Sequence, residues 1–120
     1  MTEAPNKIYD LEERTYLFAR NVSSFCKKLP KSVSNFEYGK QVIRSSGSIG
    51  ANYIEANEAL GKKDFLMRVR ICRKEAKESA YWLRLIAETN IDAVKGECRK
   101  LFQEAIELKK ILSKILENSK

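Results

Sequence analysis

The residues of this chain best suited to chemistry are cations that recur along one face of a segment near its middle. The excess of positive charge is greatest between residues 61 and 90, in a chain whose net charge is +7. At about 100° of rotation per residue of an α-helix, these cations share one side with a tyrosine: Lys63, Arg70, Arg73, Lys74, Lys77, Tyr81 and Arg84. Such a row can follow a phosphate backbone, and a tyrosine ring can stack on a base. The pattern indicates nucleic-acid binding, but an ordinary solvated helix face also carries many lysines and arginines.

A second group of residues lies on the flank of the same segment. Ile71, Glu75, Glu78 and Trp82 follow one another at spacings of four, three and four. Large apolar residues outside a core stripe usually mark contact with another chain. We expect these four residues to form a subunit interface with three from the preceding segment: Ser48, Asn52 and Glu55. The alternative is that Trp82 only seals the edge of its own domain and that the polar residues hydrogen-bond within it.

The chain contains no histidine, which removes the commonest catalytic arrangements. Ser-His-Asp triads, Cys-His pairs, the Glu-x-x-His motif of di-iron bundles and Cys/His zinc sites all need one. Mechanisms based on lysine, tyrosine or carboxylates remain, and Glu55, Glu75 and Glu78 could gather in an interior. Nothing in the sequence supplies a paired nucleophile or a cofactor motif. We therefore expect a protein that is not an enzyme and has no cofactor and no metal.

The three cysteines and the absence of long apolar runs indicate the cellular setting. Cys26, Cys72 and Cys98 lie on or beside apolar stripes, as small buried hydrophobic residues do; the alternative is a metal-binding or redox trio. The first residues are polar and form no secretory signal, and no run approaches the roughly 20 apolar residues of a membrane span. These features favour a cytoplasmic protein without a disulfide framework and without a membrane partner.

Four stretches of the chain repeat apolar residues at spacings of four and three. The stripes run from Leu11 to Leu29, from Val42 to Leu60, from Phe65 to Ile86 and from Val94 to Ile115. This is the period of an amphipathic helix in a bundle, whereas a strand would alternate by two. The pattern predicts an all-α fold with helices at about residues 10–29, 35–60, 64–89 and 93–117, in one domain spanning residues 1–120. Connections this short favour an antiparallel four-helix bundle in up-down-up-down order.

The breaks between the stripes carry residues typical of helix ends. The candidates are Asp10 with Glu13 as a capping box, Pro30 as a stop, Ser34 or Asn35 as the second N-cap, Gly61 as a C-cap and Asp64 as the third N-cap. Within the second stripe small residues crowd two turns between Ser45 and Ala51, which favours close approach of another helix. The Ser-Gly-Ser-Ile-Gly run lacks the Gly-Lys-Ser/Thr ending of a phosphate-binding loop, so it predicts no nucleotide site.

The second and third stripes also resemble a known family. The run from Gln41 to Ala56 (QVIRSSGSIGANYIEA), the Lys63-Asp64-Phe65 triplet and the run from Lys74 to Leu83 (KEAKESAYWL) are similar to bacterial four-helix bundle proteins. This family includes proteins encoded by intervening sequences in large-subunit ribosomal RNA genes. The resemblance spans roughly residues 10–117. It departs at Gly50, where the family often has Pro, and at Ala56, where it often has Gly.

The resemblance implies a bundle that assembles into a ring-like homo-oligomer, commonly a pentamer. A related branch, the accessory protein of diversity-generating retroelements, is a basic ring that works with a reverse transcriptase and nucleic acid. Two hypotheses for this chain follow. The first is a non-catalytic basic bundle that binds RNA or DNA as an accessory or ribonucleoprotein component. The second is an oligomeric scaffold that binds protein and has no nucleic-acid role.

Overall fold

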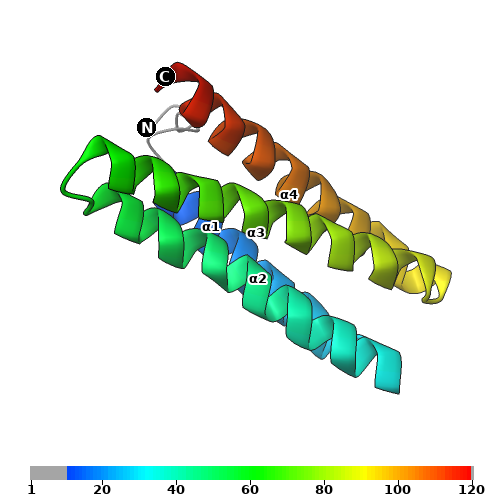
Figure 1. Cartoon of the computed structure of the whole chain (residues 1–120). Coiled ribbons are helices and arrows are strands. Elements are labelled where there is room, and N and C mark those ends of the chain that lie inside the picture. The colour runs from blue at the N-terminus through cyan, green and yellow to red at the C-terminus, as the bar shows by residue number, and fades with distance from the viewer. Residues whose placement is uncertain (1–10, 120) are drawn as a thin grey trace, which may run out of the picture.

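Four antiparallel helices account for nearly all of the described chain (Figure 1). The structure is a computed structural model that describes residues 11–119. The helices are α1 (Leu11–Lys27), α2 (Val33–Asn57), α3 (Lys62–Glu88) and α4 (Asp92–Asn118), and residues 11–119 contain no strand. Each helix contacts the next one along the chain, and α1 contacts α4, so the four close into a bundle. The predicted all-α, four-helix fold is confirmed.

The helices end within one to three residues of the predicted bounds. Helix α1 stops at Lys27 because Pro30 disfavours helical geometry at the residue before it. Helix α2 begins two residues early, since Ser32 caps it by accepting a hydrogen bond from the backbone N–H of Asn35 at 3.0 Å. The prediction of Ser34 or Asn35 as this cap is therefore wrong.

The turn between α2 and α3 corrects two further predictions. Helix α2 ends at Asn57, so Leu60 lies beyond it and is fully exposed rather than part of the core stripe. Gly61 is the N-cap of α3, with an extended backbone at φ −150°, and not the C-cap of α2. Asp64 falls inside the first turn of α3, where its charge favours the helix dipole without capping it. The capping box predicted from Asp10 lies outside the described residues.

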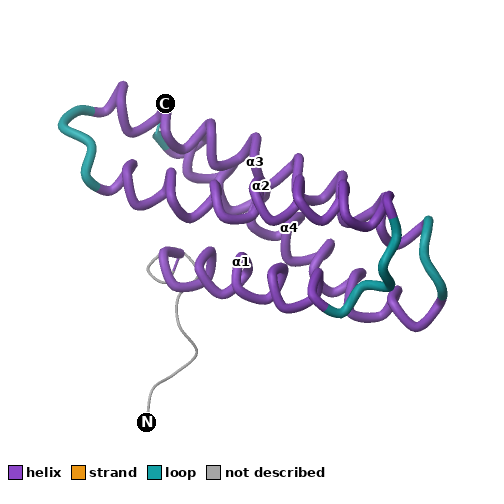
Figure 2. Tube along the Cα trace, turned by 90° about the horizontal axis from the view of Figure 1, so that it is seen from below, coloured by secondary structure: helices purple, strands orange, loops and turns teal. Residues whose placement is uncertain are grey.

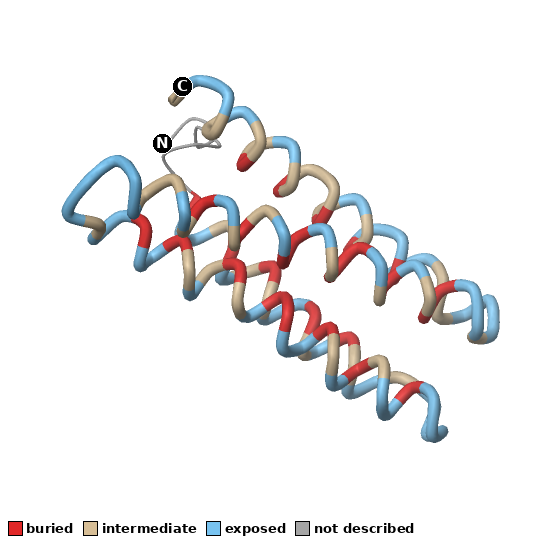
Figure 3. Tube along the Cα trace, viewed as in Figure 1, coloured by how far each residue is buried: buried red, intermediate tan, exposed pale blue. Residues whose placement is uncertain are grey.

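The core consists of the apolar stripes that the sequence predicts (Figure 3). Buried positions face the centre of the bundle and exposed positions face outward on every helix. The largest fully buried side chains come from all four helices: Phe18, Leu11, Ile49, Leu83, Ile86, Leu108 and Leu112. No helix within residues 11–119 is long and apolar enough to cross a membrane.

The turns at one end of the bundle are joined by a pair of amides. The α1–α2 and α3–α4 connections lie at this end, and the α2–α3 connection lies at the other (Figure 2). Asn35, which is buried, donates to Asn90 Oδ1 at 2.8 Å and accepts from Asn90 Nδ2 at 2.8 Å. It also donates to the Pro30 carbonyl at 2.8 Å. One buried side chain therefore satisfies polar groups from both turns.

The small residues of α2 do not all serve close packing. A Cβ placed on Gly50 would lie 3.0 Å from Thr15 Oγ1, so this glycine allows α1 to approach closely. Ser45 Oγ lies 2.7 Å from Ser79 Oγ, in the seam between α2 and α3. In contrast, a Cβ on Gly47 would meet nothing within 4 Å. Gly47 faces open space, and its small size is not needed within this chain.

Candidate nucleic-acid interface

Helix α3 presents its cations and its tryptophan to different neighbours. On one flank Trp82 stacks on Tyr38 of α2, with ring centroids 6.0 Å apart, and Glu78 pairs with Arg44 of α2 at 2.7 Å. On the other flank Arg73 and the cations around it lie beside α4. The predicted basic row is therefore the side of α3 next to α4, and the predicted interface residues lie on the side next to α2.

Four of the predicted cations line a shallow groove between α3 and α4. The basic groove, as we call it, consists of Arg70, Arg73, Lys74, Lys77, Lys109 and Ser113. Arg73 and Lys109 are half-buried, whereas Arg70, Lys74 and Lys77 are exposed. Cations from two helices on one concave surface strengthen the local positive potential more than a single row would.

The basic groove gathers on one concave surface five cations without carboxylate partners in the described part of the chain. Within residues 11–119, none of its five cations lies within 4.0 Å of an Asp or Glu oxygen. Six other cations are paired: Arg14 with Glu104, Lys28 with Glu97, Arg44 with Glu78, Arg84 with Glu88, Lys95 with Asp92 and Lys110 with Glu107. Isolated cations such as Arg20, Lys31 and Lys114 also have no carboxylate within 4.0 Å among residues 11–119, so the groove is distinguished by its gathering of charges. The bidentate hydrogen bond to Glu104 even raises the pKa of Arg14. The groove thus offers its charges to a ligand rather than to the protein itself.

Three of the predicted nucleic-acid-binding residues lie outside the basic groove. Arg84 lines a second hollow farther along α3 and α4 with Lys95, Arg99 and Phe102, but it pairs with Glu88 at 3.2 Å. Lys63, in the first turn of α3, is exposed and lines neither hollow. Tyr81 is exposed, and its ring meets Trp82 edge-on at 5.0 Å. Its role in stacking on a base stays a prediction.

The basic groove also contains two residues that the charge excess of residues 61–90 does not indicate, Lys109 and Ser113. Both come from α4, whereas the prediction rested on the local charge excess of α3 alone. The signal was present as spacing: Lys95, Arg99, Phe102, Lys109 and Ser113 recur at intervals of four, three, seven and four. This places them on one face of α4, and only the packing of α4 against α3 shows that this face adjoins the cations.

The predicted interface residues form a polar seam between α2 and α3. Asn52 donates to Ser48 Oγ at 3.0 Å and accepts from Arg68 at 3.1 Å. Glu75 is only 6% exposed, and its Oε1 is buried without a hydrogen-bond partner. Glu55 is exposed, and Ile71 is half-buried on the same side. Hydrogen bonds join Ser48 with Asn52 and Glu78 with Trp82 in this seam, and contact of the predicted residues with another subunit stays a prediction.

Trp82 is largely satisfied by its own chain. Its indole ring is half-buried between Tyr38 and Tyr81, and its N–H donates to Glu78 Oε2 at 3.4 Å. This geometry fits the alternative in which Trp82 seals the edge of the bundle. The apolar side chains that stand out most from this part of the fold lie elsewhere, on the outer side of α2.

The cysteines are packed as small hydrophobic residues. Cys72 and Cys98 are fully buried, and Cys26 is half-buried against Gly39. Burial raises the pKa of Cys26 and Cys98 to about 11 and that of Cys72 to about 12, so all three thiols are protonated at neutral pH. Within residues 11–119, no three His, Cys, Asp or Glu side chains gather as metal ligands would.

Comparison with known proteins shows the family. A family model described as 23S rRNA-intervening sequence protein matches residues 8–114, nearly the whole chain. The chain belongs to this family. The resemblance inferred from the second and third stripes is thereby confirmed. No curated protein matches the chain significantly.

A solved structure supports the same assignment. It is the crystal structure of a protein with unknown function from the S23 ribosomal protein family of Bacteroides thetaiotaomicron. The two chains are 30% identical, with a TM-score of 0.75, and the match covers 88% of this chain and 96% of the other. The fold and the family are thus common to both proteins.

Proposed function

We propose that this chain is a non-catalytic, homo-oligomeric bundle that binds RNA or DNA through the basic groove. The observation that carries the proposal is the gathering of five cations from α3 and α4 without a carboxylate partner among residues 11–119. Six other cations among residues 11–119 are neutralised by a neighbouring Asp or Glu residue. Unpaired cations along a groove are what a polyanionic backbone requires.

The chemistry of the groove suits phosphate more than base recognition. Arg70 and Arg73 carry planar guanidinium groups that can bind phosphate oxygens in pairs, and Lys74, Lys77 and Lys109 supply point charges. Most of the contacts would therefore be independent of sequence. Tyr81, exposed on the outward side of α3, is the residue we expect to stack on an unpaired base. Since the family's name refers to an intervening sequence of 23S rRNA, RNA is the first ligand to test.

Filter binding across a salt series tests the proposal with a charge-matched control. In the first variant Arg70, Arg73, Lys74 and Lys77 are replaced by glutamine. In the control the same number of exposed cations outside the groove is replaced: Arg20, Lys31, Lys100 and Lys114. We expect the groove variant to lose most of its affinity and salt dependence, and the control to retain both. Equal losses of affinity in the two variants would show that the net charge, and not the groove, attracts the nucleic acid. Absent or salt-insensitive binding by the native protein would contradict the proposal.

The assembly part of the proposal rests on the family resemblance and on the polar seam. We expect a ring-like homo-oligomer, with a pentamer as the expected ring, and subunit contacts that include the Trp82 side of α3. Trp82→Glu should lower the mass measured by light scattering, with thermal unfolding recorded to show that the variant is folded. A native protein that is strictly monomeric would refute the ring. A reverse transcriptase is a further partner implied by the retroelement branch of the resemblance, and co-purification tests it.

The competing function is an oligomeric protein scaffold with no nucleic-acid role. The exposed apolar side chains on the outer side of α2 favour a protein contact of some kind. Purification without nuclease separates the two functions. An absorbance ratio typical of clean protein favours the scaffold, whereas co-purified nucleic acid that is lost from the groove variant favours the basic groove.

A further inference from the structure

The outer face between α1 and α2 carries a group of exposed apolar side chains. The α1/α2 face, as we define it, comprises Tyr16, Ala19 and Ser23 of α1 and Phe36, Ile43, Gly47 and Ile54 of α2. Tyr16, Phe36, Ile43 and Ile54 are 59%, 66%, 45% and 50% exposed. Gly47 lies among them with open space in front of it. An exposed apolar strip of this kind marks a contact with another molecule more often than a free surface.

The two ends of this strip carry opposite charges. The register of the two helices follows from Glu12, which accepts a hydrogen bond from Asn57 at 2.7 Å, and from Cys26, whose Sγ is 3.7 Å from the Cβ position of Gly39. Glu12 of α1 is therefore level with Glu58 at one end of the strip. At the other end Lys27 of α1 is level with Lys40, whose Nζ lies 5.3 Å from the centre of the Phe36 ring.

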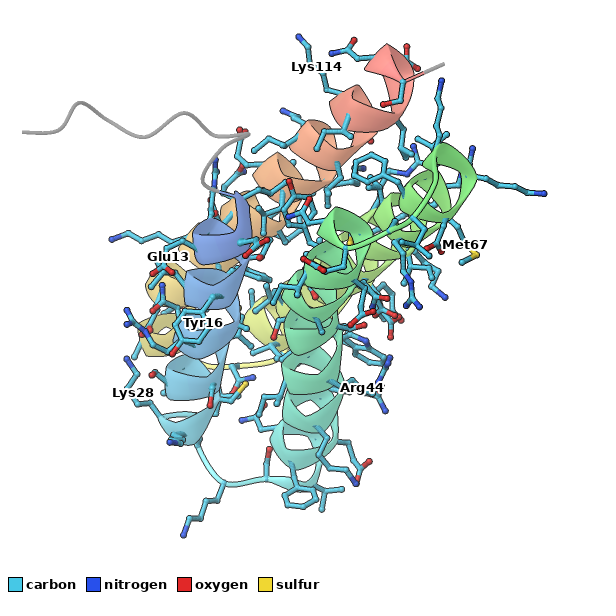
Figure 4. All side chains as sticks on the ribbon, turned by 90° about the vertical axis from the view of Figure 1, so that its left-hand side faces the viewer. Glu13, Tyr16, Lys28, Arg44, Met67 and Lys114 are labelled. Atoms are coloured by element: carbon cyan, nitrogen blue, oxygen red, sulfur yellow. The ribbon has the colours of Figure 1, made fainter. Side chains whose placement is uncertain are left out.

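Figure 4 shows the direction of α1, with Glu13 and Tyr16 in its first half and Lys28 directly after its last residue, Lys27. In the same view Arg44 points to the opposite side of α2, away from α1. Because α1 and α2 are antiparallel, carboxylates at the start of α1 and at the end of α2 fall together. The lysines at the end of α1 and near the start of α2 likewise coincide.

We infer that the α1/α2 face binds the same face of a second copy of this chain, related by a two-fold rotation. Turning one copy by half a turn places its Lys27 over Glu12 of the other copy and its Lys40 over Glu58. The same rotation places the apolar strip of one copy on the apolar strip of the other. A surface that is complementary to itself in this way is what an isologous contact requires. The inference deepens the self-association in the proposed function and is independent of its nucleic-acid part. A two-fold contact and the head-to-tail contacts of a ring use different faces, so both can exist in one assembly.

Two of the other long faces, between α3 and α4 and between α1 and α4, do not suit a two-fold contact. Two copies of the basic groove would place five unpaired cations against five, which repel each other. Between α1 and α4 the charges are already paired within the chain, as Arg14 with Glu104 at 2.6 Å and Lys28 with Glu97 at 2.8 Å. The α1/α2 face combines apolar area with unpaired charges of both signs, and it is the one we assign to a second copy.

Charge reversal tests the inference with two complementary variants. The all-basic variant carries Glu12→Lys and Glu58→Lys, and the all-acidic variant carries Lys27→Glu and Lys40→Glu. Each alone places like charges at both ends of a two-fold contact, so we expect the mass measured by light scattering at low salt to fall by half. A mixture of the two variants places opposite charges at both ends, so the native mass should return. A single chain with all four substitutions should also recover it.

The control and the contrary outcomes are equally specific. Lys100→Glu with Lys114→Glu changes the charge on α4, away from this face, and should leave the mass unchanged. An unchanged mass in both reversal variants would overturn the inference. The inference would also be overturned if the mass falls and neither the mixture nor the fourfold variant restores it, because these charges would then contact some other surface. Gly47→Gln adds a side chain into open space, so the fold should persist while the mass falls. In light scattering without nucleic acid, the charge-reversal variants test this contact and Trp82→Glu tests the ring, whereas filter binding tests the basic groove, so the proposals fail separately.

Discussion

Lys109 provides the sharpest single test of the basic groove, because it belongs to α4 and its role depends on the tertiary structure. Its side chain is half-buried in the groove beside Arg73 and Lys77. For binding to duplex nucleic acid, the logarithm of the affinity falls with the logarithm of salt concentration by about 0.9 per phosphate neutralised. Five engaged cations therefore predict a slope of about −4.5, and Lys109→Gln should change it to about −3.6.

The same relation sets the size of the affinity loss. One phosphate contact with a slope of about 0.9 corresponds to roughly eightfold in affinity at 0.1 M salt relative to a 1 M reference. Lys100→Gln is the matched control, since Lys100 is an exposed lysine of α4 that does not line the groove. Fluorescence anisotropy of a labelled RNA duplex, measured from about 50 to 200 mM salt, gives both the slope and the affinity for each variant.

The two lysine variants divide the possible results clearly. A loss of affinity and slope in Lys109→Gln alone supports contact within the groove. Equal effects of Lys109→Gln and Lys100→Gln would show that the net charge attracts nucleic acid without a defined site. If neither variant changes the slope, α4 takes no part in binding, and the groove between α3 and α4 is not the interface.

Three further predictions concern the fold. Asn35→Ala removes the donor from Asn90 Oδ1 and from the Pro30 carbonyl, whereas Asn90 Nδ2 keeps its bond to the Ile86 carbonyl. Chemical denaturation should therefore show a loss of about 3 kcal/mol in unfolding free energy, and a loss below about 1 kcal/mol would mean that water replaces the Asn35 amide. Gly47→Ala should raise the unfolding free energy by about 1 kcal/mol, because alanine has the higher helix propensity. Gly50→Ala should raise it less or lower it, since the added Cβ would lie 3.0 Å from Thr15 Oγ1. Equal gains in the two variants would refute the close approach of α1. A thiol is protonated below its pKa, so raising the pKa of Cys26 from 9.0 to about 11 lowers its thiolate fraction at neutral pH by about a hundredfold. The rate at which a thiol reagent modifies Cys26 should therefore be slow in the folded protein and rise toward pH 11. A rate equal to that of the unfolded chain would contradict the burial of this thiol.

The sequence alone determines the helices of this protein and their inward faces. A spacing of three and four residues is a local property, so the apolar stripes predict the four helices and nearly all of the core without knowledge of their packing. Helix ends are less determined where several capping residues adjoin. Ser32, Ser34 and Asn35 are all competent N-caps, and Gly61 can end one helix or begin the next, so the backbone path selects among them.

The row of cations on α3 is likewise visible in the sequence. The sequence does not show whether these cations are free to bind a ligand. Whether a cation is neutralised depends on which residues from distant parts of the chain lie beside it. Arg44 meets Glu78 across the seam between α2 and α3, whereas Arg70 and Lys77 meet Lys109 across the groove between α3 and α4. Helix packing brings together side chains more than thirty residues apart, and local periodicity contains no information about that pairing. The sequence therefore determines the helices and their charges, and only the tertiary structure decides which charges remain free to bind a ligand.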